Sequence, residues 1–128
     1  MTVLVGRCHC GTVKFVVNSP EGLQGLRRCN CSLCKRKGVV MATAKLAELE
    51  VTEGQEHLSL YEWNTKKAKH YFCSQCGIYT HHQRRAAPDE FGFNVACIAG
   101  VDITELGEVP MTDGTAMSLV ENERHGIN

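Results

Sequence analysis

The chain has 128 residues, of which 14 are basic and 14 are acidic, so its formal net charge is zero. A balanced charge gives no attraction to nucleic acids or anionic membranes, and no apolar stretch is long enough to span a bilayer. Because the N-terminus also lacks a secretory signal, we expect a single cytoplasmic domain over residues 1–128 that binds neither nucleic acid nor membranes.

Short β-type segments dominate the first half of the chain. The apolar run at residues 3–5 and the β-branched segment 12–17 predict a hairpin with Gly11 near its turn. Residues 18–25 are rich in turn formers and predict a loop, whereas residues 39–44 predict a buried strand. Residues 44–51 fit either a short helical turn or the start of the next strand.

The second half continues the same pattern. Residues 58–63 and 68–72 alternate between apolar and polar side chains, with a turn expected at Asn64 and Thr65. Residues 78–83 and 91–100 predict two more strands, separated by a loop that contains Pro88. Beyond Pro110 the sequence is polar and aperiodic, and residues 119–128 predict a loose tail. The period of two and the lack of a long amphipathic helix predict a mainly β fold.

Eight cysteines are a high number for a cytosolic chain, where they indicate metal binding more often than disulfides. Cys8 and Cys10 form a C-x-C motif, and Cys73 and Cys76 form a C-x-x-C motif followed by Gly77. Together these motifs supply four thiolates, the usual donor set of a closed structural zinc site. The glycine lets the backbone turn after the motif and direct N–H groups at sulfur.

Cys29, Cys31 and Cys34 remain as a set of three. A site with three protein ligands keeps an open coordination position, which is typical of a catalytic or ligand-binding zinc. The spacing leaves another partition open, in which Cys29 and Cys31 join the C-x-x-C motif and Cys34 joins the N-terminal pair. A fourth ligand for the second site could also come from elsewhere; the candidates are Cys97, His81 and His82.

Several candidates have a simpler interpretation. Cys97 lies in an apolar segment and is expected to be a small buried side chain. His81 and His82 are adjacent, so in a strand they point to opposite faces and at most one can reach a metal. His9 is expected on the surface. The basic residues beside the second set could bind the carboxylates of an acidic substrate, offset the charge of the thiolates or simply lie in water; they are Lys35, Arg36 and Lys37.

Four segments occur in a fixed order over residues 6–102: GRCHCGTVKF, CNCSLCKRKG, HYFCSQCGIY and FGFNVACIAGVD. In these motifs the chain resembles the glutathione-dependent formaldehyde-activating enzyme family, also called centromere-protein-V-like. The resemblance implies a zinc-pinned, mainly β fold of the type found in methionine sulfoxide reductase B. It also implies a structural zinc and a second zinc implicated in activity. The ligands would be Cys8, Cys10, Cys73 and Cys76 for the first, and Cys29, Cys31 and Cys34 for the second.

The resemblance implies an activity that adds formaldehyde to glutathione, which in reverse is a carbon–sulfur lyase. We therefore expect a zinc-dependent enzyme acting on adducts of glutathione, or a similar small thiol, with an aldehyde. The substrate sulfur would be the fourth ligand of the second zinc, and His81 or His82 is the candidate base.

Two other functions stay open. One is a non-enzymatic zinc module that binds a protein partner, with both zincs structural. The other is a redox or metal sensor that releases zinc on mild oxidation.

Overall fold

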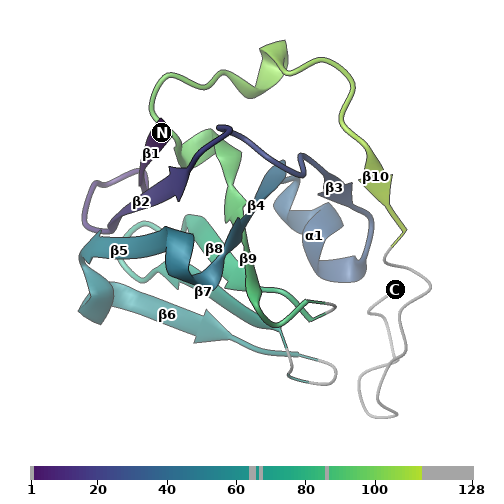
Figure 1. The fold of residues 1–128 in the computed structure, drawn as a ribbon. Helices are drawn as coiled ribbons and strands as arrows, with labels where there is room; N and C mark the ends of the chain where they lie inside the picture. Colours follow the sequence, from purple (N-terminus) through teal and green to yellow (C-terminus); the bar gives the residue numbers. More distant parts are fainter. Residues whose placement is uncertain (1, 64–65, 67, 86, 114–128) are drawn as a thin grey trace.

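The computed structural model describes residues 2–63, 66, 68–85 and 87–113, and in these the chain is mainly β, as predicted (Figure 1). The predicted turn at Asn64 and Thr65 and the predicted tail at 119–128 lie outside the described residues. No helix in the described part is long and apolar enough to cross a membrane. The elements are β1 (Thr2–Arg7), β2 (Lys14–Ser19), β3 (Arg28–Cys29), α1 (Ser32–Lys37), β4 (Met41–Lys45), β5 (Leu49–Glu53), β6 (Leu58–Tyr61), β7 (Lys69–Cys73), β8 (Tyr79–Gln83), β9 (Glu90–Asn94) and β10 (Met111–Thr112).

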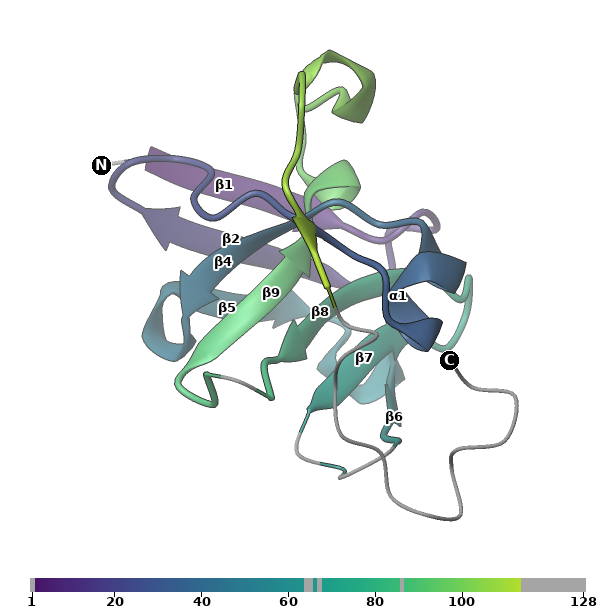
Figure 2. The same cartoon turned by 90° about the vertical axis from the view of Figure 1, so that its right-hand side faces the viewer.

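Two antiparallel sheets make up most of the fold. The first has three strands in the order β1-β2-β5, and the second has five strands in the order β4-β9-β8-β7-β6. A short parallel pair, β3 and β10, brings the end of the described chain beside the segment that leads into α1. Figure 2 shows β4 and β9 running between the three-stranded sheet and α1.

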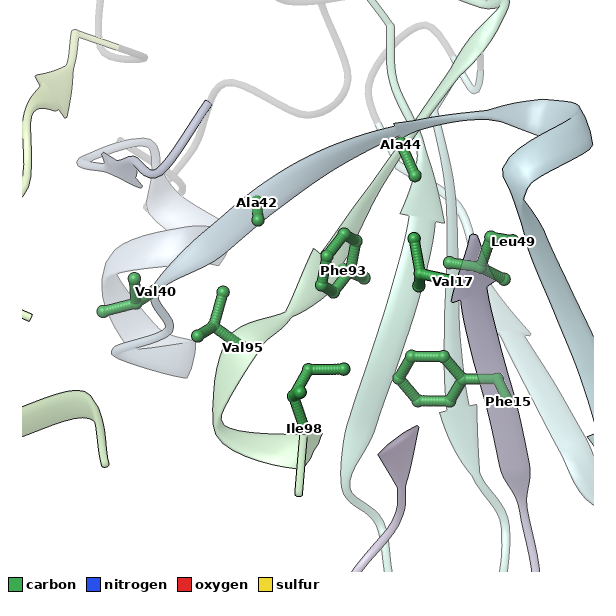
Figure 3. Packing of buried hydrophobic residues seen from close by; sticks show 9 residues of the cluster. All are labelled: Phe15, Val17, Val40, Ala42, Ala44, Leu49, Phe93, Val95 and Ile98. Atoms are coloured by element: carbon green, nitrogen blue, oxygen red, sulfur yellow. The ribbon is translucent and has the colours of Figure 1, made fainter. Parts of the chain in front are cut away.

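The main hydrophobic core lies between the two sheets (Figure 3). Alternation along β2 buries Phe15 and Val17 while Lys14 and Asn18 are exposed, so one face of this strand is apolar. Phe93 of β9 packs in the same cluster from the five-stranded sheet. Each such fully buried side chain contributes about 1.5–3 kcal/mol to folding, so this interface holds the sheets together.

The five-stranded sheet is covered on both faces, and the two adjacent histidines of β8 show this. The His81 ring stacks on Tyr71 at 4.8 Å and lies 6.2 Å from Phe15, so it points toward the three-stranded sheet. The His82 ring stacks on His70 at 5.0 Å, on the face that carries α1. The prediction that these histidines point to opposite faces is therefore confirmed.

The predicted hairpin is also confirmed. β1 and β2 pair from Thr2 with Ser19 to Arg7 with Lys14, and Gly11 in the connection has a φ of +81°. Because β2 continues to Ser19, the loop predicted over residues 18–25 starts later than expected. Residues 44–51 contain both predicted alternatives, a 3₁₀ turn at Leu46–Glu48 and then β5.

Two strands begin or end at residues other than those predicted. The strand predicted over residues 39–44 starts at Met41 and continues to Lys45. The strand predicted over residues 91–100 ends at Asn94, because the side chain of Asn94 accepts a hydrogen bond from the N–H of Ala96 and starts a 3₁₀ turn at Val95–Cys97. Cys97 is therefore half-buried at the end of a turn, not buried within a strand.

Candidate metal centres

Four cysteine sulfurs from two distant parts of the chain meet at one end of the fold. Cys8 and Cys10 lie in the connection between β1 and β2, Cys73 ends β7, and Cys76 lies in the turn before β8. All four sulfurs lie within 4.8 Å of one another. The Cys10 sulfur is 3.6 Å from that of Cys8 and 3.7 Å from that of Cys73. A tetrahedron of sulfurs at 2.3 Å from zinc has edges of about 3.8 Å, so this four-cysteine site fits the ion.

Backbone geometry supports the four-cysteine site. The N–H of Val13 donates to the Cys8 sulfur and the N–H of Gln75 donates to the Cys73 sulfur, both at 3.3 Å. Gly77 has a φ of +78° and its N–H donates to the carbonyl of Cys73 at 2.7 Å, which closes the turn. The predicted role of Gly77 in turning the backbone is confirmed, while Gln75 donates the N–H to sulfur. Such hydrogen bonds favour the thiolate form that metals require.

The other three cysteines converge where β3 leads into α1. Cys29 ends β3, Cys31 is the N-cap of α1, and Cys34 lies in the first turn of the helix. Their sulfurs lie within 4.8 Å of one another. The N–H of Cys34 donates to the Cys31 sulfur at 3.3 Å, and the N–H of Cys31 donates to the Cys29 sulfur at 3.5 Å. We call this group the three-cysteine site.

Neither C-x-C motif lies within a regular strand. Cys8 and Cys10 lie in a hairpin connection, and Cys29 and Cys31 lie at a strand end and a helix cap. A turn or a helix start curls the chain more tightly than a strand. The curl brings neighbouring sulfurs together and points backbone N–H groups at them, as at Cys31 and Cys34.

The structure groups the sulfurs as four and three, in the first of the two partitions considered above. Among the described residues, no fourth histidine, cysteine or carboxylate joins Cys29, Cys31 and Cys34. The possible fourth ligands Cys97, His81 and His82 belong to neither group. His81 also faces the three-stranded sheet, so it cannot act as a base at the three-cysteine site.

Hydrogen bonding distributes charge unequally over the three thiols. Hydrogen bonds from the thiols of Cys29 and Cys34 lower the pKa of Cys31 to about 2. Hydrogen bonds with the thiols of Cys29 and Cys31 raise the pKa of Cys34, and the bond with Cys31 raises the pKa of Cys29. The first thiolate therefore forms at Cys31, where the N–H of Cys34 also points at the sulfur. An anionic soft donor set of this kind fits zinc.

A cluster of polar side chains that no sequence pattern predicts lies beside the three-cysteine site on the α1 face of the sheet. Lys37 Nζ lies 3.3 Å from His70 Nδ1 and 3.7 Å from the centre of the Tyr79 ring. The Tyr79 hydroxyl lies 2.6 Å from His82 Nδ1. Tyr79 also packs in one hydrophobic cluster with Cys31 and Cys34. We call Lys37, His70, Tyr79 and His82 the polar cluster.

An irregularity in β8 places two members of the polar cluster on the same face. Tyr71 of β7 pairs with His81, whereas its neighbour Phe72 pairs with Tyr79, so Thr80 is an extra residue in the ladder. In a regular strand, side chains three residues apart point to opposite faces. The extra residue reverses this relationship, and Tyr79 can reach His82.

Burial determines the charge states in the polar cluster. It lowers the pKa of His70 to about 4 and that of His82 to about 2, so both imidazoles are neutral at pH 7. Burial raises the pKa of Tyr79, whose hydroxyl therefore stays protonated and forms a hydrogen bond with His82 Nδ1. Burial also lowers the pKa of Lys37 to about 8, although the negative charges of Cys34 and Cys31 oppose this effect.

The basic residues of α1 differ from one another in their surroundings. Lys35 and Arg36 are exposed, whereas Lys37 is half-buried and lines two hollows of about 280 and 260 Å³. His9 is exposed, as expected. A larger hollow of about 660 Å³ lies away from α1, beside Cys8 and the 3₁₀ turn that contains Cys97.

Comparisons with known proteins agree with this arrangement. The family model described as "Glutathione-dependent formaldehyde-activating enzyme" matches residues 3–107. A crystal structure of a Rhodobacter sphaeroides protein, whose title gives no activity, has 53% identity and a TM-score of 0.81, covering 84% of this chain and 99% of that one. A curated Halomonas elongata protein is 35% identical over 82 residues, which is 58% of this chain.

The Halomonas elongata protein carries the name "Putative glutathione-dependent formaldehyde-activating enzyme". The match spans 52% of its length, so the chain corresponds to about half of this curated relative. The family match, in contrast, covers both cysteine sites and all strand residues of the two sheets except Thr2. The chain therefore belongs to the glutathione-dependent formaldehyde-activating enzyme family.

Proposed function

We propose that the protein is a single-domain, cytoplasmic, zinc-dependent enzyme of the carbon–sulfur lyase type. Its substrates would be adducts of glutathione, or a similar small thiol, with an aldehyde of the formaldehyde type. The observation that carries this proposal is the convergence of Cys29, Cys31 and Cys34 on one point, with no fourth side chain of the described residues beside them. A three-ligand site of this kind leaves room for a substrate sulfur.

The two cysteine sites have different roles in this proposal. Cys8, Cys10, Cys73 and Cys76 hold a structural zinc, because four thiolates complete a tetrahedral site. Cys29, Cys31 and Cys34 hold a second zinc at the start of α1. This location supports the proposal, since the helix N-terminus stabilises the negative charge of a thiolate.

The reaction requires a thiolate and a proton donor. A zinc ion bound by the three cysteines favours the thiolate form of the substrate sulfur at neutral pH. In the forward direction the sulfur forms a bond to the aldehyde carbon, the carbonyl π electrons move to oxygen, and the oxygen gains a proton. In reverse the oxygen loses its proton, the carbonyl forms again and the carbon–sulfur bond breaks. Cys29, Cys31 and Cys34 would hold the zinc ion, and this ion would keep the sulfur in position for both directions.

Exchange spectroscopy by NMR tests this function, because it measures interconversion of free aldehyde and its thiol adduct at equilibrium. Aldehydes and thiols also react unaided, so the rate must be compared with that of buffer. The zinc-loaded protein should raise the exchange rate, Cys34→Ser should abolish the increase, and Cys97→Ser should retain it. Cys97 is a matched control because it belongs to neither cysteine group.

The same experiment separates the enzyme from a zinc module that only binds a protein partner. A protein that holds two zincs but exchanges no faster than buffer, with any of several small thiols, would contradict the enzyme and favour that module. A zinc that leaves under mild oxidation, without any rate increase, would favour a sensor.

A further inference from the structure

Lys37 lies next to the three-cysteine site for two independent structural reasons. It follows Cys34 by three residues in α1, a spacing that places the two side chains on neighbouring positions of the helix surface. Its Nζ lies 3.7 Å above the Tyr79 ring, which packs against Cys31 and Cys34.

The polar cluster holds the Lys37 ammonium in one position. Neutral His70 accepts a hydrogen bond from Lys37 Nζ at 3.3 Å, and the Tyr79 ring face attracts the cation from the other side. The hydrogen bond between Tyr79 and His82 fixes the orientation of this ring. The His70 ring stacks on the His82 ring at 5.0 Å, so the histidine that contacts Lys37 also packs against the histidine that contacts Tyr79. A lysine on a helix of six residues would otherwise extend into water, as Lys35 does.

Lys37 also has access to small molecules. It forms part of the wall of both smaller hollows, one toward Leu33 and Phe72 and one toward Asn94. A proton on Nζ can therefore exchange with solvent while most of the side chain is buried. None of the ion pairs among the described residues includes Lys37. No carboxylate therefore competes for the Lys37 ammonium. The thiolates balance its charge, and the ammonium can form a hydrogen bond with an oxygen of the substrate.

We propose that Lys37 is the catalytic acid and base that gives and takes the proton of the adduct oxygen at the three-cysteine site. This inference rests on the proposed function. In adduct formation the sulfur bonds to the aldehyde carbon, the carbonyl electrons move to oxygen, and the Lys37 ammonium donates a proton to that oxygen. In adduct cleavage the neutral amine takes this proton, the carbonyl forms and the thiolate leaves.

The protonation state of Lys37 predicts a specific pH dependence for the rate of adduct cleavage. Only the neutral amine can accept the proton, and the pKa of Lys37 is lowered to about 8. The rate of cleavage above that of buffer should therefore rise with pH and level off beyond about 8. The groups that face Lys37 are His70 from β7, Tyr79 and His82 from β8, and Cys31 and Cys34 at the start of α1. The pKa values of the two histidines are lowered to well below 8, and the pKa of Tyr79 is raised above its usual value.

Three variants of the zinc-loaded protein test the assignment. Lys37→Met should slow cleavage by about 10²-fold and remove the pH step, because no other amine replaces it. Lys37→Arg keeps the positive charge but cannot release its proton, so it should be equally slow. Lys35→Met changes an exposed lysine of the same helix and should leave the rate unchanged. Zinc content and circular dichroism must match the unchanged protein in all three.

A second measurement does not depend on activity. In protein labelled with ¹³C at the lysine ε-carbon, the signal that Lys37→Arg removes should titrate near pH 8, below the usual lysine range. Titration of Lys37 above pH 10 would overturn the assignment. If Lys37→Arg cleaves the adduct as fast as the unchanged protein does, the assignment is overturned as well, because the positive charge alone would then be sufficient. If the unchanged protein is no faster than buffer, the proposed function itself fails and this role fails with it.

Discussion

The sulfur atoms of Cys10 and Cys73 lie 3.7 Å apart, although 63 positions separate the two residues in the chain. Cys10 belongs to the connection between β1 and β2, and Cys73 ends β7, so the contact joins the two sheets. Cys8, Val13 and Cys73 form a small buried cluster at this end of the fold, separate from the main core. The four-cysteine site therefore lies where the two sheets meet outside the main hydrophobic core.

Replacing Cys73 should unfold the domain. Structural zinc contributes about 10–16 kcal/mol of binding free energy, as much as or more than the whole stability of a small domain. Cys73→Ser removes one of the four ligands and leaves a buried hydroxyl at a fully buried position. We expect loss of the β-type circular dichroism signal at 25 °C, together with loss of cooperative thermal unfolding.

Cys97→Ser is the control for that experiment. The Cys97 thiol is half-buried and donates to the carbonyl of Tyr79 at 3.7 Å, a contact that a serine hydroxyl can keep. Its free energy of unfolding should differ from that of the unchanged protein by less than about 1 kcal/mol. Equal stability of the two variants would contradict the structural role of the four-cysteine site.

The cysteine motifs were predictable because their spacing is local, whereas the choice of the C-x-C motif that joins Cys73 depends on a contact across 63 positions, which spacing left open. C-x-C and C-x-x-C spacings limit where sulfurs can go, and thiols have few uses in a reducing compartment other than metal binding. The strand-rich fold followed from alternation along segments such as β2. These features depend on neighbours in the sequence, so they can be predicted without knowledge of the tertiary structure.

The polar cluster was not predictable in the same way. Its members come from α1, β7 and β8, and their contact depends on the extra residue at Thr80. No sequence period reports a single extra residue in a strand. α1 was also missed, because its six residues are too few to show a helical period and its N-cap is Cys31, not one of the usual capping residues. The resemblance to methionine sulfoxide reductase B stays a prediction.

Removing the Tyr79 hydroxyl should destabilise the protein. Tyr79→Phe leaves buried His82 Nδ1 without the partner that now lies 2.6 Å away. An unpaired buried polar group costs about 1–3 kcal/mol, which should appear as a lower urea midpoint. Tyr61→Phe, at an exposed tyrosine of β6, should leave the midpoint unchanged. If both variants unfold at the same midpoint as the unchanged protein, the hydrogen bond does not support the polar cluster.

Protonation of His81 should destabilise the protein in mild acid. Burial lowers the pKa of His81 to about 4 in the folded protein, against about 6.5 in the unfolded chain. The unfolded state therefore binds a proton first as pH falls below 6.5, and stability declines from there toward pH 4. At pH 5 this one residue removes about 2 kcal/mol.

His81→Phe isolates that effect, because the ring can keep its packing against Tyr71 and Phe91 but cannot bind a proton. Between pH 7 and pH 5 the variant should lose about 2 kcal/mol less unfolding free energy than the unchanged protein, as measured by urea denaturation. Losses due to zinc release are common to both proteins and cancel. Equal losses would show that His81 is not held neutral by burial.

Zinc content per chain, measured by elemental analysis under reducing conditions and repeated after Cys31→Ser, tests the central claim most directly. Serine can still cap α1 in place of Cys31, whose sulfur now accepts the N–H of Cys34, so this variant should fold. The account predicts two zincs per chain falling to one, with circular dichroism retained. A single zinc from the start, or unfolding of Cys31→Ser as complete as that of Cys73→Ser, would contradict it.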